Sequence, residues 1–281
     1  MKKYIKIFGI LVLTGFSFFY TEKVTKIVRS KDPIMIKIKS VKKENYIEAI
    51  KPIINDDEYI MGINGCEIDI EKSYNKMKQT GEYKKDLLIM KEVNNDSKLK
   101  NKYIVSGNKL QKNVSLIFLI KDREDEELIK YLSDKKIKVN FFVDQKYLEN
   151  NSVIVKFISK NNNIYYLGND GNYDDKYMMY AKNLVEINSN NESKYCLLNK
   201  KDDITLNLCT EYNMKTIKTD YIKENIIQNI KSNLENGSIF TIDSTYDENI
   251  KASINYILSK GYNIVTLDKL LNSNSECKEF E

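Results

Sequence analysis

The region from Val114 to about Leu271 alternates regularly between strand-like and helix-like segments, and this alternation constrains the fold more than any other feature. Short apolar runs such as VSLIFLI (114–120) and KVNFFVD (138–144) are typical of buried strands, and amphipathic segments separate them. Such alternation predicts an α/β domain with parallel strands, either a barrel or a doubly wound sheet. The seven strand-like runs span 114–120, 138–144, 164–168, 194–198, 214–219, 237–242 and 262–267.

A different pattern precedes this domain. Residues 34–41 (IMIKIKSV) alternate apolar with charged or polar side chains, which predicts a strand with one buried face. A short helix is predicted between Asp69 as its N-cap and Gly81 as its C-cap. Residues 86–93 (DLLIMKEV) then predict a second strand. The predicted units are a leader at 1–22, a small α+β unit at 34–105, the α/β domain at 112–272 and a polar tail at 273–281.

The N-terminus has a basic start followed by an uncharged, mainly apolar run, Ile7–Tyr20. This run is short against the ~20 residues that cross a bilayer, and no small-x-small cleavage site follows it. We favour an uncleaved signal-anchor; a cleaved signal peptide and a buried helix are the alternatives. Because the basic residues stay cytoplasmic, we expect a single-pass protein of the cell membrane, held through residues 5–20, with its bulk extracytoplasmic.

Composition excludes several functions. The chain contains no histidine, which excludes a histidine-bound metal and any Ser–His or Cys–His pair within the chain. Carboxylate, lysine, tyrosine and cysteine chemistry stay open. The formal net charge is +5, but 45 basic and 40 acidic residues are interspersed, and no basic stretch alternates with aromatics. We therefore expect no nucleic-acid partner.

The four cysteines are compatible with disulfides outside the cytoplasm. Cys196 lies in a strand-like segment and Cys209 in the following helix-like one, DDITLNLCTEYN. A strand and the helix after it pack together, so these two cysteines are the disulfide candidate, with free buried thiols as the alternative. Cys277 lies in the polar tail and is expected to be unpaired. The spacings are too wide for a metal site built from cysteine alone.

Three segments carry a resemblance to a known family. Residues 138–143 (KVNFFV) match a strand of the type Lys-Ala-Thr-Phe-Phe-Val, and residues 236–243 (NGSIFTID) and 257–271 (ILSKGYNIVTLDKLL) match the last barrel strands. In this order and spacing, they resemble the polysaccharide deacetylases, the NodB-homology domain of carbohydrate esterase family 4. The resemblance implies a distorted, seven-stranded (β/α) barrel.

The same resemblance implies a degenerate site. Members of that family bind a divalent metal through one Asp and two His, and a second Asp activates the metal-bound water. In this chain, the family's site positions fall on Leu119, Ile120, Leu167, Gly171 and Asp243. Since these residues supply neither the ligand set nor the base, we expect no bound metal, no other cofactor and no catalytic residue of the family type.

Polar residues near the carboxyl ends of the predicted strands form a candidate groove. That end of a parallel (β/α) barrel carries the functional site. The groove candidates are Asp122, Asn169, Asp170, Asp220 and Asp243. Such oxygen ligands could bind a hard cation. The favoured interpretation is simpler, namely that they are solvated loop residues and helix caps, with Asp122 to Glu126 as the first turn of a helix.

Three functions follow from these expectations. The first is a membrane-tethered, extracytoplasmic protein of deacetylase type that is catalytically inactive and binds a cell-wall glycan or an envelope protein. The second is an active carbohydrate deacetylase, a hydrolase of C–N amide bonds, with an unconventional site. The third is a structural role in an envelope complex.

Overall fold

The computed structural model describes residues 15, 17, 20, 21, 23–44, 46–93, 99, 101–189, 191–243, 249–272 and 277. They belong to two compact units. The smaller unit draws on residues 1–49, 64–94 and 274–281, and the larger unit on 50–63 and 95–273.

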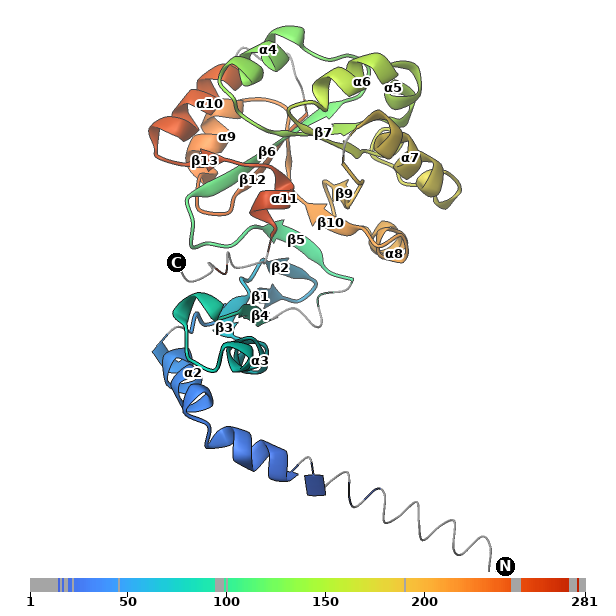
Figure 1. Cartoon of the computed structure of the whole chain (residues 1–281). Helices are drawn as coiled ribbons and strands as arrows, with labels where there is room; N and C mark the ends of the chain where they lie inside the picture. Colours follow the sequence, from blue (N-terminus) through green and yellow to red (C-terminus); the bar gives the residue numbers. More distant parts are fainter. Residues whose placement is uncertain are drawn as a thin grey trace, which may run out of the picture. The chain divides into compact units, whose positions relative to one another are not determined.

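The strands of the larger unit form two sheets (Figure 1). In one sheet every pairing is parallel, in the order β11-β12-β6-β7-β8, with β13 also paired to β6. Its members are β6 (Asn113–Ile120), β7 (Asn140–Val143), β8 (Asn163–Tyr166), β11 (Tyr221–Ile222), β12 (Ile239–Ile242) and β13 (Asn263–Ile264). The other sheet has the order β1-β2-β5-β10-β9 and is parallel except between β1 and β2. Its members are β1 (Ile53–Asn55), β2 (Glu58–Ile60), β5 (Tyr103–Ser106), β9 (Tyr195–Leu198) and β10 (Lys215–Lys218).

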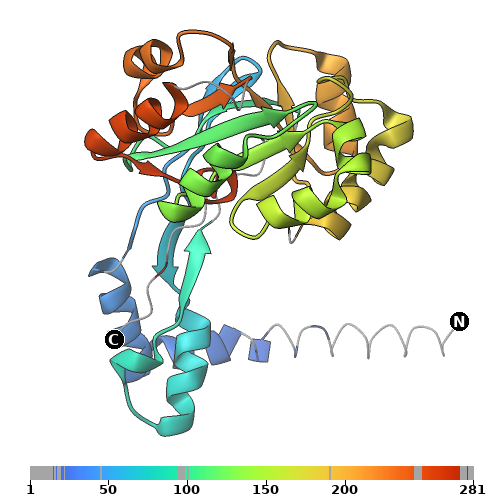
Figure 2. The same ribbon diagram turned by 90° about the horizontal axis from the view of Figure 1, so that it is seen from above.

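Helices surround these strands, as Figure 1 shows and Figure 2 shows from above. They are α4 (Glu126–Asp134), α5 (Gln145–Asn150), α6 (Ser152–Ile158), α7 (Asp175–Asn188), α8 (Asp203–Glu211), α9 (Ile226–Asn233), α10 (Asn249–Ser259) and α11 (Leu267–Leu270). Aspartate N-caps start several of them. Asp125, Asp174 and Asp202 each accept a hydrogen bond from a backbone N–H in the first turn of the helix that follows.

Alternation along the strands creates two apolar clusters. In β6, Leu116 and Phe118 lie in an outer cluster that includes buried residues of the helices, whereas Ile117 and Leu119 lie in an inner cluster. The inner cluster receives residues from both sheets, such as Phe142 and Ile217. The predicted α/β fold with parallel strands is confirmed, and its strands enclose an inner core as a barrel would.

The smaller unit corrects the prediction for residues 34–41. These residues lie in helix α2 (Pro33–Glu44), not in a strand. Proline suits the first turn of a helix, and the carboxylate of Asp32 accepts a hydrogen bond from the backbone N–H of Ile34. Ile34 and Ile38 are buried one helical turn apart, while the isoleucine midway between them is exposed. The alternation of apolar and polar residues is therefore compatible with a helix whose buried face recurs every four residues.

The remaining predictions for this unit are confirmed in part. Helix α3 (Ile70–Thr80) begins at Asp69, whose side chain accepts from Lys72 N–H, and ends at Gly81 in the left-handed conformation, as predicted. Strand β4 (Met90–Val93) covers only the second half of the predicted strand at 86–93, because a 3₁₀ turn, Lys85–Leu87, takes up its start. It pairs antiparallel with β3 (Gly65–Ile68).

The structure divides the chain differently from the predicted boundary at residue 105. Strands β1 and β2 precede that boundary and β5 spans it, but all three belong to the larger unit. Burial explains the difference, since Tyr59 of β2 and Ile104 of β5 pack in the inner cluster of the larger unit. Of the predicted tail at 273–281, only Cys277 is among the described residues.

Two disulfides are present. Cys196 of β9 is bonded to Cys209 of α8, with their Cα atoms 6.4 Å apart, which is the candidate pair. Cys277 is bonded to Cys66 of the smaller unit, with a Cα separation of 5.7 Å, so the expectation that Cys277 is unpaired is wrong. A tail cysteine carries no sequence signal for a partner 211 positions away.

We expect peptide mapping under non-reducing conditions to find both disulfides in protein exported by its native route. The bond between Cys196 and Cys209 closes a short loop, and its loss should cost roughly 3 kcal/mol of unfolding free energy. Thermal unfolding with and without a reductant measures this cost. Free thiols at both Cys196 and Cys209 would contradict the pairing.

The predicted membrane segment, residues 5–20 within the leader at 1–22, lies mostly outside the described residues. Within the part of the chain that the structure describes, no helix has the length and apolar character needed to cross a membrane.

Candidate functional site

A lysine occupies the centre of the carboxyl-end face. Lys121 directly follows β6, and its ammonium lies 3.0 Å from a carboxylate oxygen of Asp243, the residue after β12. Asp170, in the loop after β8, lies 3.4 Å from the same ammonium. Lys223, the residue after β11, reaches the second oxygen of Asp243 at 3.8 Å. Parallel strands bring these residues together because their carboxyl ends lie at one edge of the sheet.

The loop that carries Asp170 is held by Asp144. This buried residue follows β7, and its carboxylate accepts hydrogen bonds from the backbone N–H groups of Lys146, at 2.8 Å, and Asp170, at 2.7 Å. Gly168 has a φ of 86° and lies so close to Asn172 that an added Cβ atom would stand 2.5 Å from its carbonyl oxygen. The loop conformation is thus set by local contacts.

The charges at this centre favour the ammonium form. Burial of Lys121 acts to lower its pKa, but the hydrogen bond with Asp243 and the charges of Asp243 and Asp170 outweigh burial and raise the pKa above its ordinary value. A lysine whose pKa is raised stays charged at neutral pH. Lys121 therefore places a fixed positive charge between two carboxylates.

Three of the family's site positions carry buried hydrocarbon side chains. Leu119 and Leu167 are buried in the inner cluster, while Ile120 is buried in the outer cluster among residues of the helices. Gly171 lies in the turn after β8 with a φ of 87°. Of these positions, Asp243 alone carries an ionisable side chain, and that side chain is 9% exposed.

Only part of the candidate groove comes together. Asp170 and Asp243 meet through Lys121. Asp122, Asn169 and Asp220 are exposed, and Asp220 lines a separate pocket of about 320 Å³ with Ser106 and Lys218. Predicting the site from acids alone missed Lys121, although its position directly after a buried strand, between Ile120 and Asp122, was a usable signal.

The donor set does not fit a divalent metal. Among the described residues, no group of three or more Asp, Glu, Cys or His side chains is placed to hold an ion. Where two carboxylates converge, the ammonium of Lys121 already compensates their charge. Leucine side chains at two of the family's site positions offer no ligand atom.

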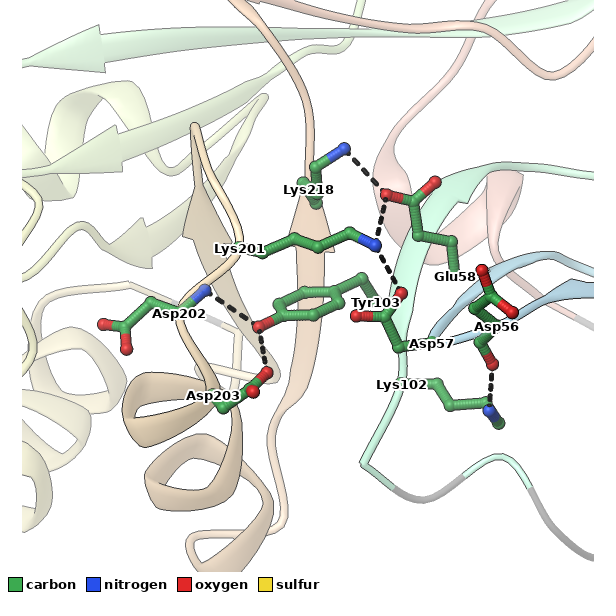
Figure 3. A network of polar contacts seen from close by, with 9 residues as sticks. All are labelled: Asp56, Asp57, Glu58, Lys102, Tyr103, Lys201, Asp202, Asp203 and Lys218. Carbon is green, nitrogen blue, oxygen red and sulfur yellow. Dashed lines mark hydrogen bonds and ion pairs between the residues drawn. The ribbon is translucent and has the colours of Figure 1, made fainter.

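A second polar cluster in the larger unit is saturated with partners (Figure 3). The carboxylate of Glu58 lies 2.9 Å from the ammonium of Lys218 and 3.4 Å from that of Lys201, which also pairs with Asp57. The hydrogen bond from Lys218 is the main reason that the pKa of Glu58 is lowered. The hydroxyl of Tyr103 donates a hydrogen bond to the carboxylate of Asp203 and accepts one from the backbone N–H of Asp202. These contacts fasten β2 and β5 to the loop after β9.

Replacing Lys121 with methionine is expected to destabilise the protein. The substitution nearly keeps the length of the side chain but removes its charge. Among the described residues, it leaves the carboxylate of Asp243, whose side chain is 9% exposed, with only Lys223 as a cationic partner, and Lys223 is 70% exposed. An under-compensated buried charge costs roughly 1–3 kcal/mol. The shift of the urea unfolding midpoint measures the cost.

Two controls separate this effect from general damage. Lys223→Met removes the more distant, exposed partner and should cost less than about 0.5 kcal/mol. Adding Asp243→Asn to Lys121→Met should recover part of the loss, because the uncompensated charge is gone. Equal costs for Lys121→Met and Lys223→Met would show that Lys121 has no special place in the site.

Comparisons with known proteins point to one fold. No family model matches the sequence. The chain is 24% identical over 241 residues to the uncharacterized protein YlxY of Bacillus subtilis (strain 168). The alignment covers 76% of this chain and 75% of YlxY. The structure of BA3943 of Bacillus anthracis, described as a CE4 family pseudoenzyme, is 19% identical and aligns with a TM-score of 0.61 over 87% of this chain and 96% of its own.

An esterase of the same family has the fold as well. PdaA of Bacillus subtilis, a family 4 carbohydrate esterase, is 13% identical and aligns with a TM-score of 0.52 over 61% of this chain and 85% of its own. At these identities the likeness speaks for the fold. Together with the ordered strand and helix pattern, it shows that this chain carries the polysaccharide deacetylase fold of carbohydrate esterase family 4.

Proposed function

We propose that this chain is a membrane-tethered, extracytoplasmic, catalytically inactive protein of deacetylase type that binds a component of the cell envelope, a glycan in the first instance. The observation that carries the proposal is the ammonium of Lys121, 3.0 Å from Asp243. It supplies a fixed positive charge at the carboxyl-end face, where an enzyme of this fold needs an exchangeable metal ion.

Two further observations support inactivity. The chain has no histidine, and Leu119 and Leu167 fill family site positions with buried hydrocarbon. A carboxyl-end face without metal-ligating side chains suits recognition better than hydrolysis. Exposed polar side chains such as those of Asp122 and Asn169 are available there to form hydrogen bonds with a hydroxyl-rich polymer. The apolar leader and the disulfides support an extracytoplasmic place.

Pull-down of the full-length protein on insoluble peptidoglycan and on chitin tests the proposal. Retention should fall for the pair Asp122→Ala and Lys223→Ala on the carboxyl-end face. It should not fall for Glu192→Ala and Lys194→Ala, which lie at the amino end of β9. The protein should also carry no stoichiometric zinc by elemental analysis. One tightly bound zinc per chain, or retention that both pairs leave unchanged, would contradict the proposal.

A further inference from the structure

A helical segment follows directly on the apolar run of the leader. Its described residues, 20, 21 and 23–30, are helical, and we call this segment the stalk helix. Each of these residues is exposed and belongs to the smaller unit. The backbone N–H of Lys31 donates to the carbonyl oxygen of Val28, a tighter turn that ends the segment, so Lys31 lies past its last regular turn.

One side of the stalk helix is apolar. Tyr20, Val24, Ile27 and Val28 succeed one another at helical spacing, and their exposed fractions are 73%, 40%, 50% and 64%. At 3.6 residues per turn they fall within an arc of about 100°. No charged residue of the stalk helix falls inside that arc. The segment is therefore amphipathic, with its whole apolar side exposed.

The polar side of the stalk helix contacts the rest of the smaller unit. The guanidinium of Arg29 lies 3.4 Å from the carboxylate of Glu71 on α3 and 5.9 Å from the centre of the Tyr74 ring on the same helix. A helix at the surface of a soluble domain ordinarily packs through its apolar side and turns its polar side to water. In the stalk helix this arrangement is reversed, so its apolar side faces away from α3.

The charge of the segment is positive. Residues 21–31 contain four basic residues and one acidic residue, a net charge of +3 (four positive minus one negative). The ion pair of Arg29 with Glu71 compensates one of these charges and leaves +2. A second copy of the same helix would bring like charges together, whereas a surface of anionic lipid headgroups attracts them. Charge therefore favours a lipid surface over a second copy as the cover of the apolar side.

We propose that the stalk helix lies on the surface of the membrane, with Tyr20, Val24, Ile27 and Val28 at the boundary between acyl chains and anionic headgroups. The apolar side begins at Tyr20, where the apolar run Ile7–Tyr20 ends, so a leader held by the membrane brings this side to its surface. Tyrosine is enriched at headgroup level, and an apolar side accompanied by lysines is typical of interfacial helices. This inference rests on the membrane tether of the proposed function.

A single tryptophan tests the contact, because the chain contains none of its own. The whole chain carrying Ile27→Trp is reconstituted in vesicles of phosphatidylglycerol and phosphatidylcholine brominated on its acyl chains, since bromine quenches tryptophan on contact. We expect the emission to shift to shorter wavelength and to lose intensity to the bromine. Thr25→Trp is the matched control. Thr25 is exposed on the polar side, opposite Ile27, so its emission should stay that of a solvated indole.

Lipid charge provides a second arm. Replacing phosphatidylglycerol with unbrominated phosphatidylcholine keeps the bromine content and should weaken the quenching of Ile27→Trp. Adding Lys23→Gln and Lys31→Gln in the anionic vesicles should lower the ratio of docked to undocked helix about fivefold for each charge removed.

Flotation of the same vesicles separates the tether from the docking. A chain that floats with vesicles of both compositions, but whose tryptophan at position 27 is not quenched, would overturn the docking and leave the tether standing. A shift to shorter wavelength without quenching would mean that protein covers the apolar side, and equal quenching at positions 25 and 27 would mean that lipid surrounds the helix. Either result would overturn the proposal. A chain that does not float would contradict the tether and the docking together.

Discussion

Full-length protein supplied with N-acetylglucosamine oligomers and zinc is expected to release acetate no faster than buffer alone. Hydrolysis of an amide at neutral pH requires an activated water and stabilisation of the oxyanion that develops on the carbonyl oxygen. Leucine and isoleucine at 119 and 120 provide no base, and the carboxylate of Asp243 would repel the oxyanion. The deficit relative to a working enzyme should be about 10⁶-fold or more.

Restoring the two acids should not rescue activity. Leu119→Asp would bury a carboxylate in the inner cluster and Ile120→Asp would bury one in the outer cluster, each at a cost of several kcal/mol. The two histidine positions would also remain empty. Metal-stimulated acetate release by the unmodified protein, abolished by Asp243→Asn, would contradict inactivity and reveal a carboxylate site.

Local signals in the sequence predicted the larger unit well. Each of the seven strand-like runs overlaps a strand of the structure, because burial on both faces requires continuous apolar residues and turns separate them. Helix caps could also be predicted from local sequence, since α3 begins after Asp69 and ends before Gly81 as expected. Where the pattern was ambiguous, at residues 34–41, the proline and the capping Asp32 decided for a helix.

Contacts between distant residues could not be predicted in the same way. The pairing of Lys121 with Asp243, that of Lys218 with Glu58 and the disulfide of Cys277 each depend on chain segments more than a hundred residues apart. No period or spacing encodes such pairs. The sequence could name polar residues near the strand ends as a candidate groove, but it could not say which of them meet, or that a lysine compensates the charge of two of them.

Raising the pH from about 9 to about 12 is expected to unfold the larger unit cooperatively, through its buried tyrosines. Tyr103 and Tyr166 are almost fully buried, and burial raises the pKa of each to about 12. Burial also raises the pKa of Tyr165, Tyr195 and Tyr221. A phenolate at these buried positions would also lie near carboxylates, Asp203 for Tyr103 and Asp144 for Tyr166, so unfolding becomes the route by which these groups ionise.

The sign follows from proton binding. A tyrosine whose pKa is higher in the folded state keeps its full contribution to stability below the unfolded pKa of 10 and loses it as the pH rises toward 12. A rise from 10 to about 12 corresponds to roughly 2.7 kcal/mol for each of these two tyrosines. Their sum approaches the whole stability of many domains, about 5–15 kcal/mol.

Tyrosinate absorbance and far-ultraviolet circular dichroism, followed together against pH, measure this transition. The two signals should change in one step, because the buried phenols ionise only as the unit unfolds. Tyr166→Phe removes one titrating group together with its hydrogen bond to Gln145, so it should move the midpoint of alkaline unfolding to higher pH. The control Tyr177→Phe, at an exposed position, should leave this midpoint in place. Gradual ionisation of all tyrosines near pH 10 with an unchanged dichroism spectrum would contradict the coupling, because the phenolates would then be tolerated inside the fold.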